Sequence, residues 1–298
     1  MTRPSIDLAV VPVAGLGTRL LPATKSQPKE MLPVGAKPVV QYVVEEAAAS
    51  GIRRVLFVTG ASKTSIENHF DLNLDLITHL REAGKEDLLG ELDFERNGLE
   101  YFFTRQRKQL GLGHAVLCSR GFVGDQSFVV ALGDTIIGLH AESRIIARLI
   151  EEFTQSGADA VIAFQEVAAE DVRYYGIAQP GREESGEAFD VEDLIEKPSP
   201  DEAPSRLAVA ARYVFQPAIF PLLATTVPGK GGEIQLTDAI QRLIKQGGRV
   251  RGVRLRPGER RYDIGNFPSY FRAFCEFALT DEKYGAELRE HLRQTLGV

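Results

Sequence analysis

Short apolar runs alternate with helical patterns along the first half of the chain. Four of these runs have the composition of buried strands and cover residues 8–13, 55–59, 101–103 and 128–132. After the first run, Val39, Val43 and Ala47 repeat at four-residue spacing, which predicts a packed helix that ends at Gly51. Strands that alternate with helices in this way favour right-handed crossovers, so we expect an α/β fold with a doubly wound, mostly parallel sheet.

The pattern changes in the second half of the chain. A helix is predicted over 142–156, and it is followed by further strands at residues 160–167, 174–178, 188–195 and 207–215. Because few long helices separate these strands, we expect a mixed extension of the same sheet. Apolar stripes predict closing helices over 236–244, 271–278 and 284–296, and Asp281 is expected to cap the last one.

The expected organisation is a single domain over residues 1–280, with halves at about 1–140 and about 141–265. Residues 281–298 follow as a C-terminal helix, whose apolar stripe has to be buried on the domain or at a subunit interface. We therefore expect a homodimer or homotetramer. The segment 72–98 is polar and charged, and we interpret it as a surface helix and a connection that carry no chemistry.

Composition and charge exclude several classes of protein. The net charge of -6 argues against nonspecific nucleic-acid binding, so a local basic pocket or a divalent metal has to hold any polyanionic ligand. The chain has two cysteines, no apolar span of about 18 residues and no apolar signal segment at its start, which predicts a reduced, cytoplasmic protein that does not enter a membrane. The histidines form no zinc motif, and no Gly-x-Ser-x-Gly elbow is present.

A glycine loop follows the first strand directly, with the sequence Ala14-Gly15-Leu16-Gly17-Thr18-Arg19. The two glycines allow a tight turn with bare backbone N–H groups, and Arg19 adds a planar cation suited to phosphate oxygens. With Lys25 and Lys29 nearby, the loop is typical of a polyphosphate cradle. Leu20 stands where a dinucleotide fingerprint needs a small residue, and the Walker pattern is not met. A plain strand-to-loop turn remains the alternative.

Two further loops follow the ends of predicted strands. In doubly wound sheets, ligands bind outside the carboxyl ends of the strands, so the loops 14–19, 105–113 and 133–135 are expected to meet at one crevice. Asp134 comes directly after an apolar strand and is a candidate metal ligand, with a turn-capping role as the alternative.

The motifs of the glycine loop continue beyond Arg19. The segments Gly15–Arg19, Pro28-Lys29-Glu30-Met31-Leu32-Pro33 and Lys37-Pro38 together resemble the signature of the sugar nucleotidyltransferases. The resemblance covers about residues 5–280 and implies the Rossmann-like fold of nucleotide-diphospho-sugar transferases. It also implies transfer of UMP from UTP to α-D-glucose 1-phosphate, which gives UDP-glucose and pyrophosphate with Mg2+ as the cofactor.

The resemblance also implies roles for individual residues. Arg19, Lys29 and Lys197 are the expected catalytic cations, and Asp134 and Asp263 are the expected metal ligands. Binding residues are expected at Ala14, Gly15, Gly17, Thr18, Glu30, Gln106 and Gly111 for the nucleotide, and at Gly176 and Glu196 for the sugar. A Gln amide offers both a donor and an acceptor, which suits the O4 and N3–H pair of uracil.

Each of these roles has a simpler alternative. Asp263 could cap the helix after Asn266. Glu196 and Lys197 could be solvated surface charges, and Gln106 could be an ordinary surface glutamine. The sequence also departs from the family at Ala36, Gly133 and Ile264, which stand where Asp, Pro and Cys or Thr are common. These departures put substrate tuning in doubt more than the reaction class.

The chemistry implied by the resemblance needs few special groups. The attacking oxygen of a sugar phosphate is already ionised at neutral pH, so positioning and charge neutralisation have to supply most of the catalysis. Three other functions remain open: a thymidylyltransferase, a uridylyltransferase for another hexose 1-phosphate, and a non-catalytic nucleotide-sugar sensor. Cations for a leaving group speak against the sensor, because a binding module does not need them.

Overall fold

The structure is a computed structural model that describes residues 6–96, 98–181 and 186–297. The expected limits at residues 1 and 298 therefore lie outside the described residues. These residues form a nine-stranded sheet in the order β5 (Glu100–Arg105), β4 (Arg54–Thr59), β1 (Leu8–Pro12), β6 (Phe128–Ala131), β11 (Leu207–Phe215), β8 (Ala160–Glu166), β12 (Val250–Arg254), β10 (Ala188–Glu196) and β9 (Gly176–Pro180).

Strand direction divides this sheet into two parts. β1 pairs in parallel with β4 and β6, and β4 pairs in parallel with β5, as the alternating pattern predicts. Beyond β6 the sheet is mixed: β11 runs antiparallel to β6 and β8, β12 is parallel to β8, and β10 is antiparallel to β12 and β9. The expected α/β fold with a mixed extension is confirmed, and one continuous sheet runs through both halves of the chain.

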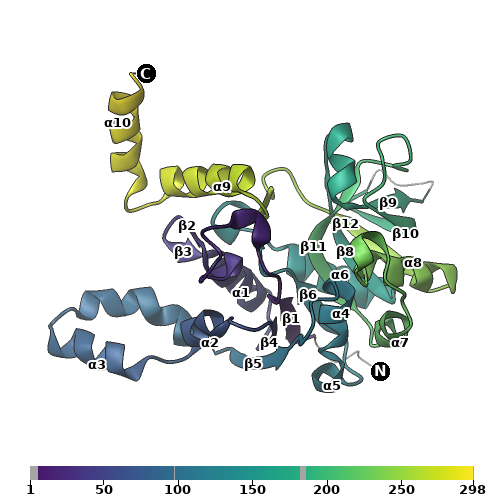
Figure 1. Cartoon of the computed structure of the whole chain (residues 1–298), viewed down its shortest axis with the longest axis horizontal. Coiled ribbons are helices and arrows are strands. Elements are labelled where there is room, and N and C mark those ends of the chain that lie inside the picture. Colours follow the sequence, from purple (N-terminus) through teal and green to yellow (C-terminus); the bar gives the residue numbers. More distant parts are fainter. Residues whose placement is uncertain (1–5, 97, 182–185, 298) are drawn as a thin grey trace.

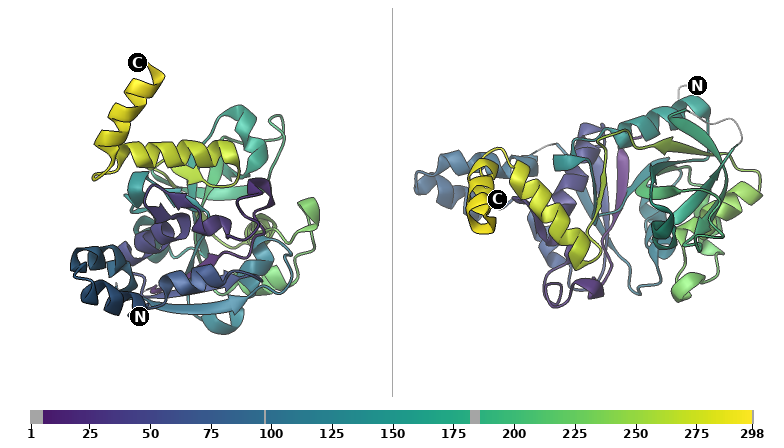
Figure 2. Two further views of the ribbon diagram at one scale, coloured as in Figure 1. Left: turned by 60° about the vertical axis from the view of Figure 1, so that its left-hand side comes forward. Right: turned by 90° about the horizontal axis from the view of Figure 1, so that it is seen from above.

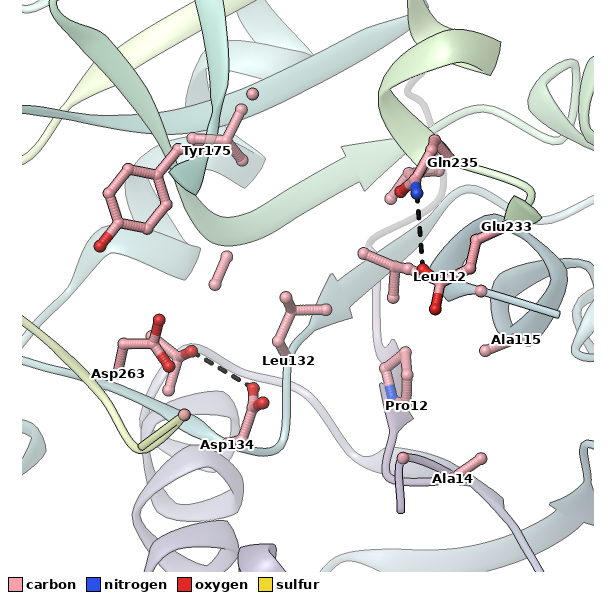
Figure 3. Close-up of a pocket in the computed structure, with 18 of the residues that line it drawn as sticks. Pro12, Ala14, Leu112, Ala115, Leu132, Asp134, Tyr175, Glu233, Gln235 and Asp263 are labelled. Carbon is pink, nitrogen blue, oxygen red and sulfur yellow. Dashed lines mark hydrogen bonds between the residues drawn. The ribbon is translucent and has the colours of Figure 1, made fainter. Parts of the chain in front are cut away.

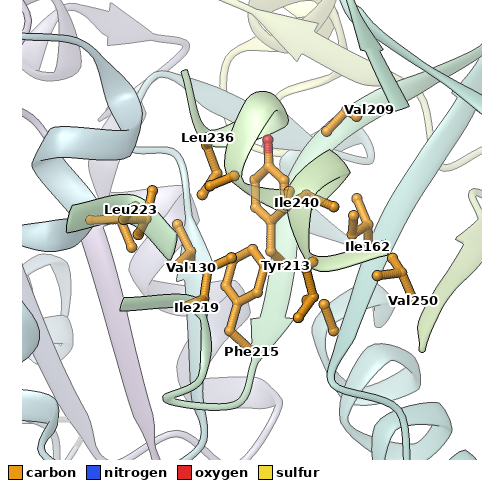
Figure 4. Close-up of a cluster of buried hydrophobic side chains, with 14 of the residues drawn as sticks. Val130, Ile162, Val209, Tyr213, Phe215, Ile219, Leu223, Leu236, Ile240 and Val250 are labelled. Atoms are coloured by element: carbon orange, nitrogen blue, oxygen red, sulfur yellow. The ribbon is translucent and has the colours of Figure 1, made fainter. Parts of the chain in front are cut away.

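Helices cover both faces of the sheet, because alternate residues of its central strands point to opposite sides. Leu8 and Val10 face a core shared with α4 (Leu112–Leu117), α7 (Ile219–Ala224) and α8 (Leu236–Lys245), which Figure 4 shows in part. Ala9 and Val11 face a second core with α1 (Val39–Ala49), α2 (Thr64–Phe70) and α6 (Ile145–Ser156). The predicted helices at 39–51 and 142–156 are thus present, with starts or ends shifted by up to three residues.

Two small two-stranded sheets lie outside the main sheet. β7 (Thr135–Ile137) pairs antiparallel with β13 (Arg261–Asp263), and β2 (Pro33–Val34) pairs with β3 (Lys37–Pro38). The sequence analysis missed β7 and β13, because three residues are too few to show a period. Their register sets Asp263 opposite Thr135, so two distant segments meet beside the carboxyl end of β6.

The remaining elements are mostly short. They are α3 (Leu74–Glu82), α5 (Arg120–Val123) and the 3-10 helices η1 (Thr18–Leu20), η2 (Lys29–Met31), η3 (Glu86–Arg96), η4 (Leu139–Ala141), η5 (Ala169–Tyr174) and η6 (Lys230–Gly232). The segment that contains α3 and η3 extends away from the sheet in Figure 1, as expected of a surface segment. Because η5 runs to Tyr174, the strand expected at 174–178 starts two residues later.

The chain closes with α9 (Phe267–Thr280) and α10 (Gly285–Leu296). Asp281 Oδ1 accepts hydrogen bonds from the backbone N–H groups of Lys283 and Tyr284, which stabilises the turn between the two helices. Asp281 ends α9 and Tyr284 is the N-cap of α10, so the prediction that Asp281 caps the last helix is wrong. In Figures 1 and 2, α10 extends beyond the body of the molecule. Its role at a subunit interface stays a prediction. Within the described residues, no helix combines the length and apolar character that crossing a membrane requires.

Candidate active site

A cavity of about 570 Å3 lies where the loops after β1, β5 and β6 meet the second half of the sheet. Its lining includes the predicted catalytic, binding and metal-ligating residues, namely Ala14, Gly15, Gly17, Thr18, Arg19, Lys29, Glu30, Gln106, Gly111, Asp134, Gly176, Glu196, Lys197 and Asp263. The chain thus brings all of these residues together. Their individual roles stay predictions. Lys25, which was expected to contribute to the polyphosphate cradle, is exposed and does not line the cavity.

The glycine loop forms one wall of this cavity. Gly17 has φ of 66°, a left-handed conformation that favours glycine, and it precedes the turn of η1 that carries Arg19. Thr24 Oγ1 donates a hydrogen bond to the Gly17 carbonyl at 2.7 Å, which ties the glycine loop to the segment after η1. Lys29 lies directly across the loop, because a Cβ atom on Gly15 would be 3.5 Å from Lys29 Cε.

Lys29 and the two candidate metal ligands form a compact charged group at the end of β6. The Lys29 ammonium donates to Asp134 Oδ2. The backbone N–H of Ile264 donates to the Asp134 carbonyl at 3.0 Å, which joins the segment after β6 to the segment after β13. Figure 3 shows the carboxylates of Asp134 and Asp263 on the same side of the cavity. Asp263 belongs to β13, and Asn266 caps α9 instead, which removes the capping alternative for Asp263.

Electrostatics distinguish the members of this group. Burial lowers the pKa of Lys29, but Asp134 and Glu30 outweigh it and raise that pKa, so the ammonium persists over the physiological range. Burial raises the pKa of Asp134, but the Lys29 ammonium outweighs it and lowers that pKa. Burial and the Asp134 charge together raise the pKa of Asp263 above its usual value. Arg261, Lys29 and Arg19 oppose this rise, and Asp263 is the carboxyl of the group whose ionised form is less favoured.

The Asp134 charge disfavours ionisation of Asp263, and a divalent cation would relieve this repulsion. Two buried carboxylates are the kind of oxygen ligand that Mg2+ takes from a protein, with phosphates and water as the other ligands. Within the described residues, no group of three His, Cys, Asp or Glu side chains gathers to form a complete metal site. A metal held by Asp134 and Asp263 would thus depend on the substrate for further ligands.

Glu30 has a partner that the sequence analysis missed. Its side chain is almost fully buried, and Oε2 accepts a hydrogen bond from Lys63 Nζ at 2.9 Å. Burial raises the pKa of Glu30, while Lys29 and Lys63 oppose that rise. Lys63 precedes α2, far from Glu30 in the sequence, and no motif marks it. The carboxylate of Glu30 therefore stabilises the wall of the cavity, and direct contact with a nucleotide stays a prediction.

Gln106 and Gly111 lie together where the loop after β5 lines the cavity. Gln106 Nε2 donates to the Gly111 carbonyl at 3.0 Å and lies 3.0 Å from His114 Nδ1. These contacts hold the Gln106 amide against the loop and the first turn of α4. Gly111 has φ of 100°, and a Cβ there would be 2.7 Å from Glu233 Cβ, so only glycine fits.

Glu196, Lys197 and Gly176 form the opposite end of the cavity. Glu196 Oε2 accepts from Thr237 Oγ1 at 2.7 Å, and Oε1 lies 3.1 Å from Lys197 Nζ. The Glu196 side chain is 13% exposed, which argues against the solvated-surface alternative. A Cβ on Gly176 would be 3.0 Å from Thr237 Oγ1, so the absence of a side chain keeps this end open.

Several cavity residues were not singled out from the sequence. They are Gln109, Tyr175, Tyr213, Glu233, Gln235, Thr237 and Arg261. Gln235 Nε2 lies 3.4 Å from Glu233 Oε2 in the half of the cavity beside Leu112, as Figure 3 shows. The only signals for Tyr175 and Arg261 were their positions beside Gly176 and Tyr262-Asp263. Thr237 had no signal, because the first turn of α8 matches none of the motifs considered.

Comparison with known proteins assigns the chain to a family. A family model described as nucleotidyl transferase matches residues 8–279. The chain belongs to the nucleotidyl transferase family. This assignment confirms the family resemblance that the motifs around Arg19 and Lys29 indicated.

Members of the nucleotidyl transferase family resemble this chain over nearly its whole length. A UTP–glucose-1-phosphate uridylyltransferase of Bacillus subtilis strain 168 is 44% identical over 294 residues, which cover 99% of this chain and 97% of the relative. A UDP-glucose pyrophosphorylase from Acinetobacter baumannii has a TM-score of 0.87 at 37% identity, with coverage of 97% of this chain and 99% of that chain. A UDP-glucose pyrophosphorylase solved in complex with UDP-glucose has a TM-score of 0.81 at 34% identity, with coverage of 90% and 97%.

Proposed function

We propose that this chain transfers UMP from UTP to α-D-glucose 1-phosphate and releases pyrophosphate, with UDP-glucose as the product. The observation that carries the proposal is the 44% identity to a UTP–glucose-1-phosphate uridylyltransferase over 99% of the chain. The cavity supports it, because its lining joins a glycine loop with Arg19 and Lys29 to the polar residues Glu196 and Lys197, with Asp134 and Asp263 also present. A non-catalytic sensor would have no use for a cation as firmly charged as Lys29.

The reaction makes one bond and breaks one bond at the same phosphorus. A phosphate oxygen of glucose 1-phosphate attacks the α-phosphorus of UTP, and the bond to the β-phosphate oxygen breaks, so the electron pair leaves with pyrophosphate. The attacking oxygen is already ionised, so no side chain has to remove a proton. The chain has to hold the two phosphates in line and neutralise the charge that gathers between them.

Arg19 and Lys29 are suited to neutralise the leaving pyrophosphate. Both lie at the glycine loop, and the raised pKa of Lys29 keeps its ammonium charged at the pH of the reaction. Lys197 is suited to orient the phosphate of the sugar substrate, and Glu196, fixed by Thr237, is suited to accept hydrogen bonds from hexose hydroxyls.

Asp134 and Asp263 are the residues that would hold the divalent cation, which we propose to be Mg2+. When bound, this cation withdraws charge from the phosphate oxygens during transfer. The Lys29 ammonium keeps Asp134 ionised, and the pairing of β7 with β13 keeps the two carboxylates side by side.

The proposal is tested by a matrix of nucleoside triphosphates against sugar 1-phosphates, with released pyrophosphate as the readout. We expect the highest kcat/KM for UTP with glucose 1-phosphate. Faster turnover of dTTP, or of another hexose 1-phosphate, would contradict the assigned substrates. Binding of nucleotide sugars without any release of pyrophosphate would contradict the assignment as an enzyme.

We also propose that the protein is a homodimer or homotetramer whose subunits meet through the C-terminal helix. Support comes from exposed apolar side chains along α9 and α10, with Phe271 57%, Tyr284 55% and Leu296 67% exposed. Exposed apolar side chains that lie close together commonly mark a surface that binds another protein.

A further inference from the structure

Arg261 occupies a defined position between the two ends of the cavity. It begins β13, two residues before Asp263, and residues two apart on a strand point to the same face. Both side chains line the cavity. Pairing of Arg261 with Ile137 in β7 fixes the backbone at this position, so the guanidinium is held on a rigid element rather than on a loop.

The contacts of Arg261 leave its charge available. The guanidinium carbon lies 3.9 Å from the centre of the Tyr175 ring, and Nη1 donates to the Val209 carbonyl at 2.7 Å. Among residues 6–96, 98–181 and 186–297, no carboxylate lies within ion-pair distance of Arg261. An aromatic face and one carbonyl satisfy only part of a group with five N–H donors.

Tyr175 connects Arg261 to the sugar end of the cavity. It precedes Gly176, and its carbonyl accepts a hydrogen bond from the Lys197 backbone N–H at 2.9 Å. Lys197 itself has φ of 48°, so a left-handed turn directs its side chain. Figure 3 shows Tyr175 in the same half of the cavity as Asp134 and Asp263, with Gln235 and Glu233 in the other half. Arg261 therefore lies between Asp263 and the residues around Gly176.

The acceptor phosphate has to occupy this same region. In the proposed reaction it is attached to the sugar at one end and attacks the α-phosphorus beside the metal carboxylates at the other. A sugar phosphate carries a charge of about -1.5 to -2 near neutral pH. Lys197 offers a single positive charge and already lies 3.1 Å from Glu196 Oε1, so one lysine does not balance the phosphate.

We propose that Arg261 binds the phosphate of the sugar 1-phosphate together with Lys197. Its planar fork can donate two parallel hydrogen bonds to phosphate oxygens while the other face of the guanidinium stays on Tyr175. This inference rests on the proposed function, because it takes the acceptor to be a sugar 1-phosphate.

The test compares Arg261→Met, Arg261→Lys and the wild type in steady-state kinetics. Methionine keeps packing on the Tyr175 ring and removes the charge, so kcat/KM for glucose 1-phosphate should fall by about 10²-fold or more while KM for UTP stays within about threefold. Lysine restores the charge without the fork, so Arg261→Lys should recover only part of the loss. Thermal melting in the absence of substrates checks that both variants fold.

Arg260→Met is the matched control. Arg260 is the preceding residue, its guanidinium pairs with Glu276 on α9, and it does not line the cavity. The same change of charge one residue away should therefore leave both KM values within about twofold of the wild type.

The possible outcomes separate this inference from the proposed function. A wild type that releases no pyrophosphate with any sugar 1-phosphate overturns both. A wild type that turns over normally overturns the inference alone if Arg261→Met keeps its kcat/KM for the sugar phosphate. The inference is also overturned if Arg261→Met raises the KM values of UTP and glucose 1-phosphate equally, since a residue that only supports the fold would do so.

Discussion

At the scale of single residues, Lys29, Asp134 and Asp263 determine the electrostatics at the centre of the cavity. Lys29 donates a hydrogen bond to Asp134, while Asp263 is left with a pKa raised by burial and by the neighbouring carboxylate. Two carboxylates held close together store repulsion that a divalent cation relieves. This repulsion supports the proposal that Asp134 and Asp263 hold a divalent cation.

Asp134→Asn tests this arrangement. It keeps the shape and removes the charge, so we expect kcat/KM to fall by about 10²-fold or more and the Mg2+ concentration for half-maximal activity to rise steeply. The melting temperature should change little, because the lost pairing with Lys29 is offset by less repulsion on Asp263. If Asp134 served only to cap a turn, the variant would lose stability and keep its metal response. Measuring activity against Mg2+ concentration and melting temperature together decides between the two.

Lys197 and Glu196 allow a second test at this scale. Lys197→Ala should lose about 2–4 kcal/mol of transition-state stabilisation with glucose 1-phosphate, the scale of one preorganised electrostatic contact. Glu196→Gln should weaken discrimination among hexose 1-phosphates, because a site that hydrogen-bonds a hydroxyl rejects analogues that lack it. KM for UTP should hardly change in either variant. Equal, small effects on the two substrates would move the sugar site elsewhere.

Single residues were predictable where a motif fixed them to the end of a strand. The glycine loop and Asp134 follow strands that periodicity identified, so their meeting at one cavity followed from the topology. Glu196 and Lys197 were predicted from the family resemblance alone. Their partners were not predictable in the same way. Lys63 reaches Glu30 and Thr237 reaches Glu196 only through the tertiary fold, and neither lies in a recognisable motif.

At the scale of elements, a buried ion pair connects a helix to two strands beside the cavity. Arg212 on β11 and Glu46 on α1 are both fully buried, and Arg212 Nη2 donates to Glu46 Oε2 at 2.7 Å and to the Thr135 carbonyl at 2.9 Å. Thr135 starts β7, directly after Asp134. The pair therefore connects α1, β11 and the first residue of β7, which follows the candidate metal ligand Asp134.

Arg212→Met should be strongly destabilising, by about 3–5 kcal/mol, because it leaves Glu46 buried without its partner. Burial raises the pKa of Glu46, and Arg212 opposes that rise. A carboxyl with a raised folded-state pKa contributes stability at low pH and loses it as pH rises through that pKa, and loss of Arg212 enlarges this effect. Chemical denaturation should thus show a smaller loss at about pH 5 than at about pH 8.

Arg206→Met is the control for this prediction. Arg206 pairs with Glu166 just before β11, but both side chains are mostly exposed, at 59% and 60%. Exposed pairs contribute about 0–1 kcal/mol, so this variant should unfold almost as the wild type does. Similar losses in the two variants would show that burial of the Arg212 pair has no special effect.

At the scale of the whole molecule, the sheet and its two cores followed from the sequence pattern. Apolar runs such as Leu8–Pro12 are buried on both faces, and this is why they lack the alternation of a half-exposed strand. The position of β11 between β6 and β8 did not follow, because strand order depends on long-range pairing that no local pattern records. The strands β7 and β13 could not be predicted either, because three residues are too few to show a period.

The C-terminal helices give a prediction at this scale. If α10 joins subunits, the full chain should sediment as a dimer or tetramer, and a variant that ends at residue 281 should shift towards the monomer. The cavity lies in the body of the molecule, so this variant should keep a KM for UTP within about threefold of the wild type. A full-length monomer, or an unchanged oligomer after truncation, would contradict the proposed interface.

The central claim is that a phosphate oxygen of glucose 1-phosphate attacks the α-phosphorus of UTP in this cavity. Incubation with [32P]glucose 1-phosphate, unlabelled UTP and Mg2+ tests it directly, followed by separation of nucleotide sugar, pyrophosphate and free phosphate. The account predicts that all transferred label appears in UDP-glucose, in amounts equal to the unlabelled pyrophosphate released. Label in pyrophosphate or free phosphate, or release of pyrophosphate without sugar phosphate, would contradict it.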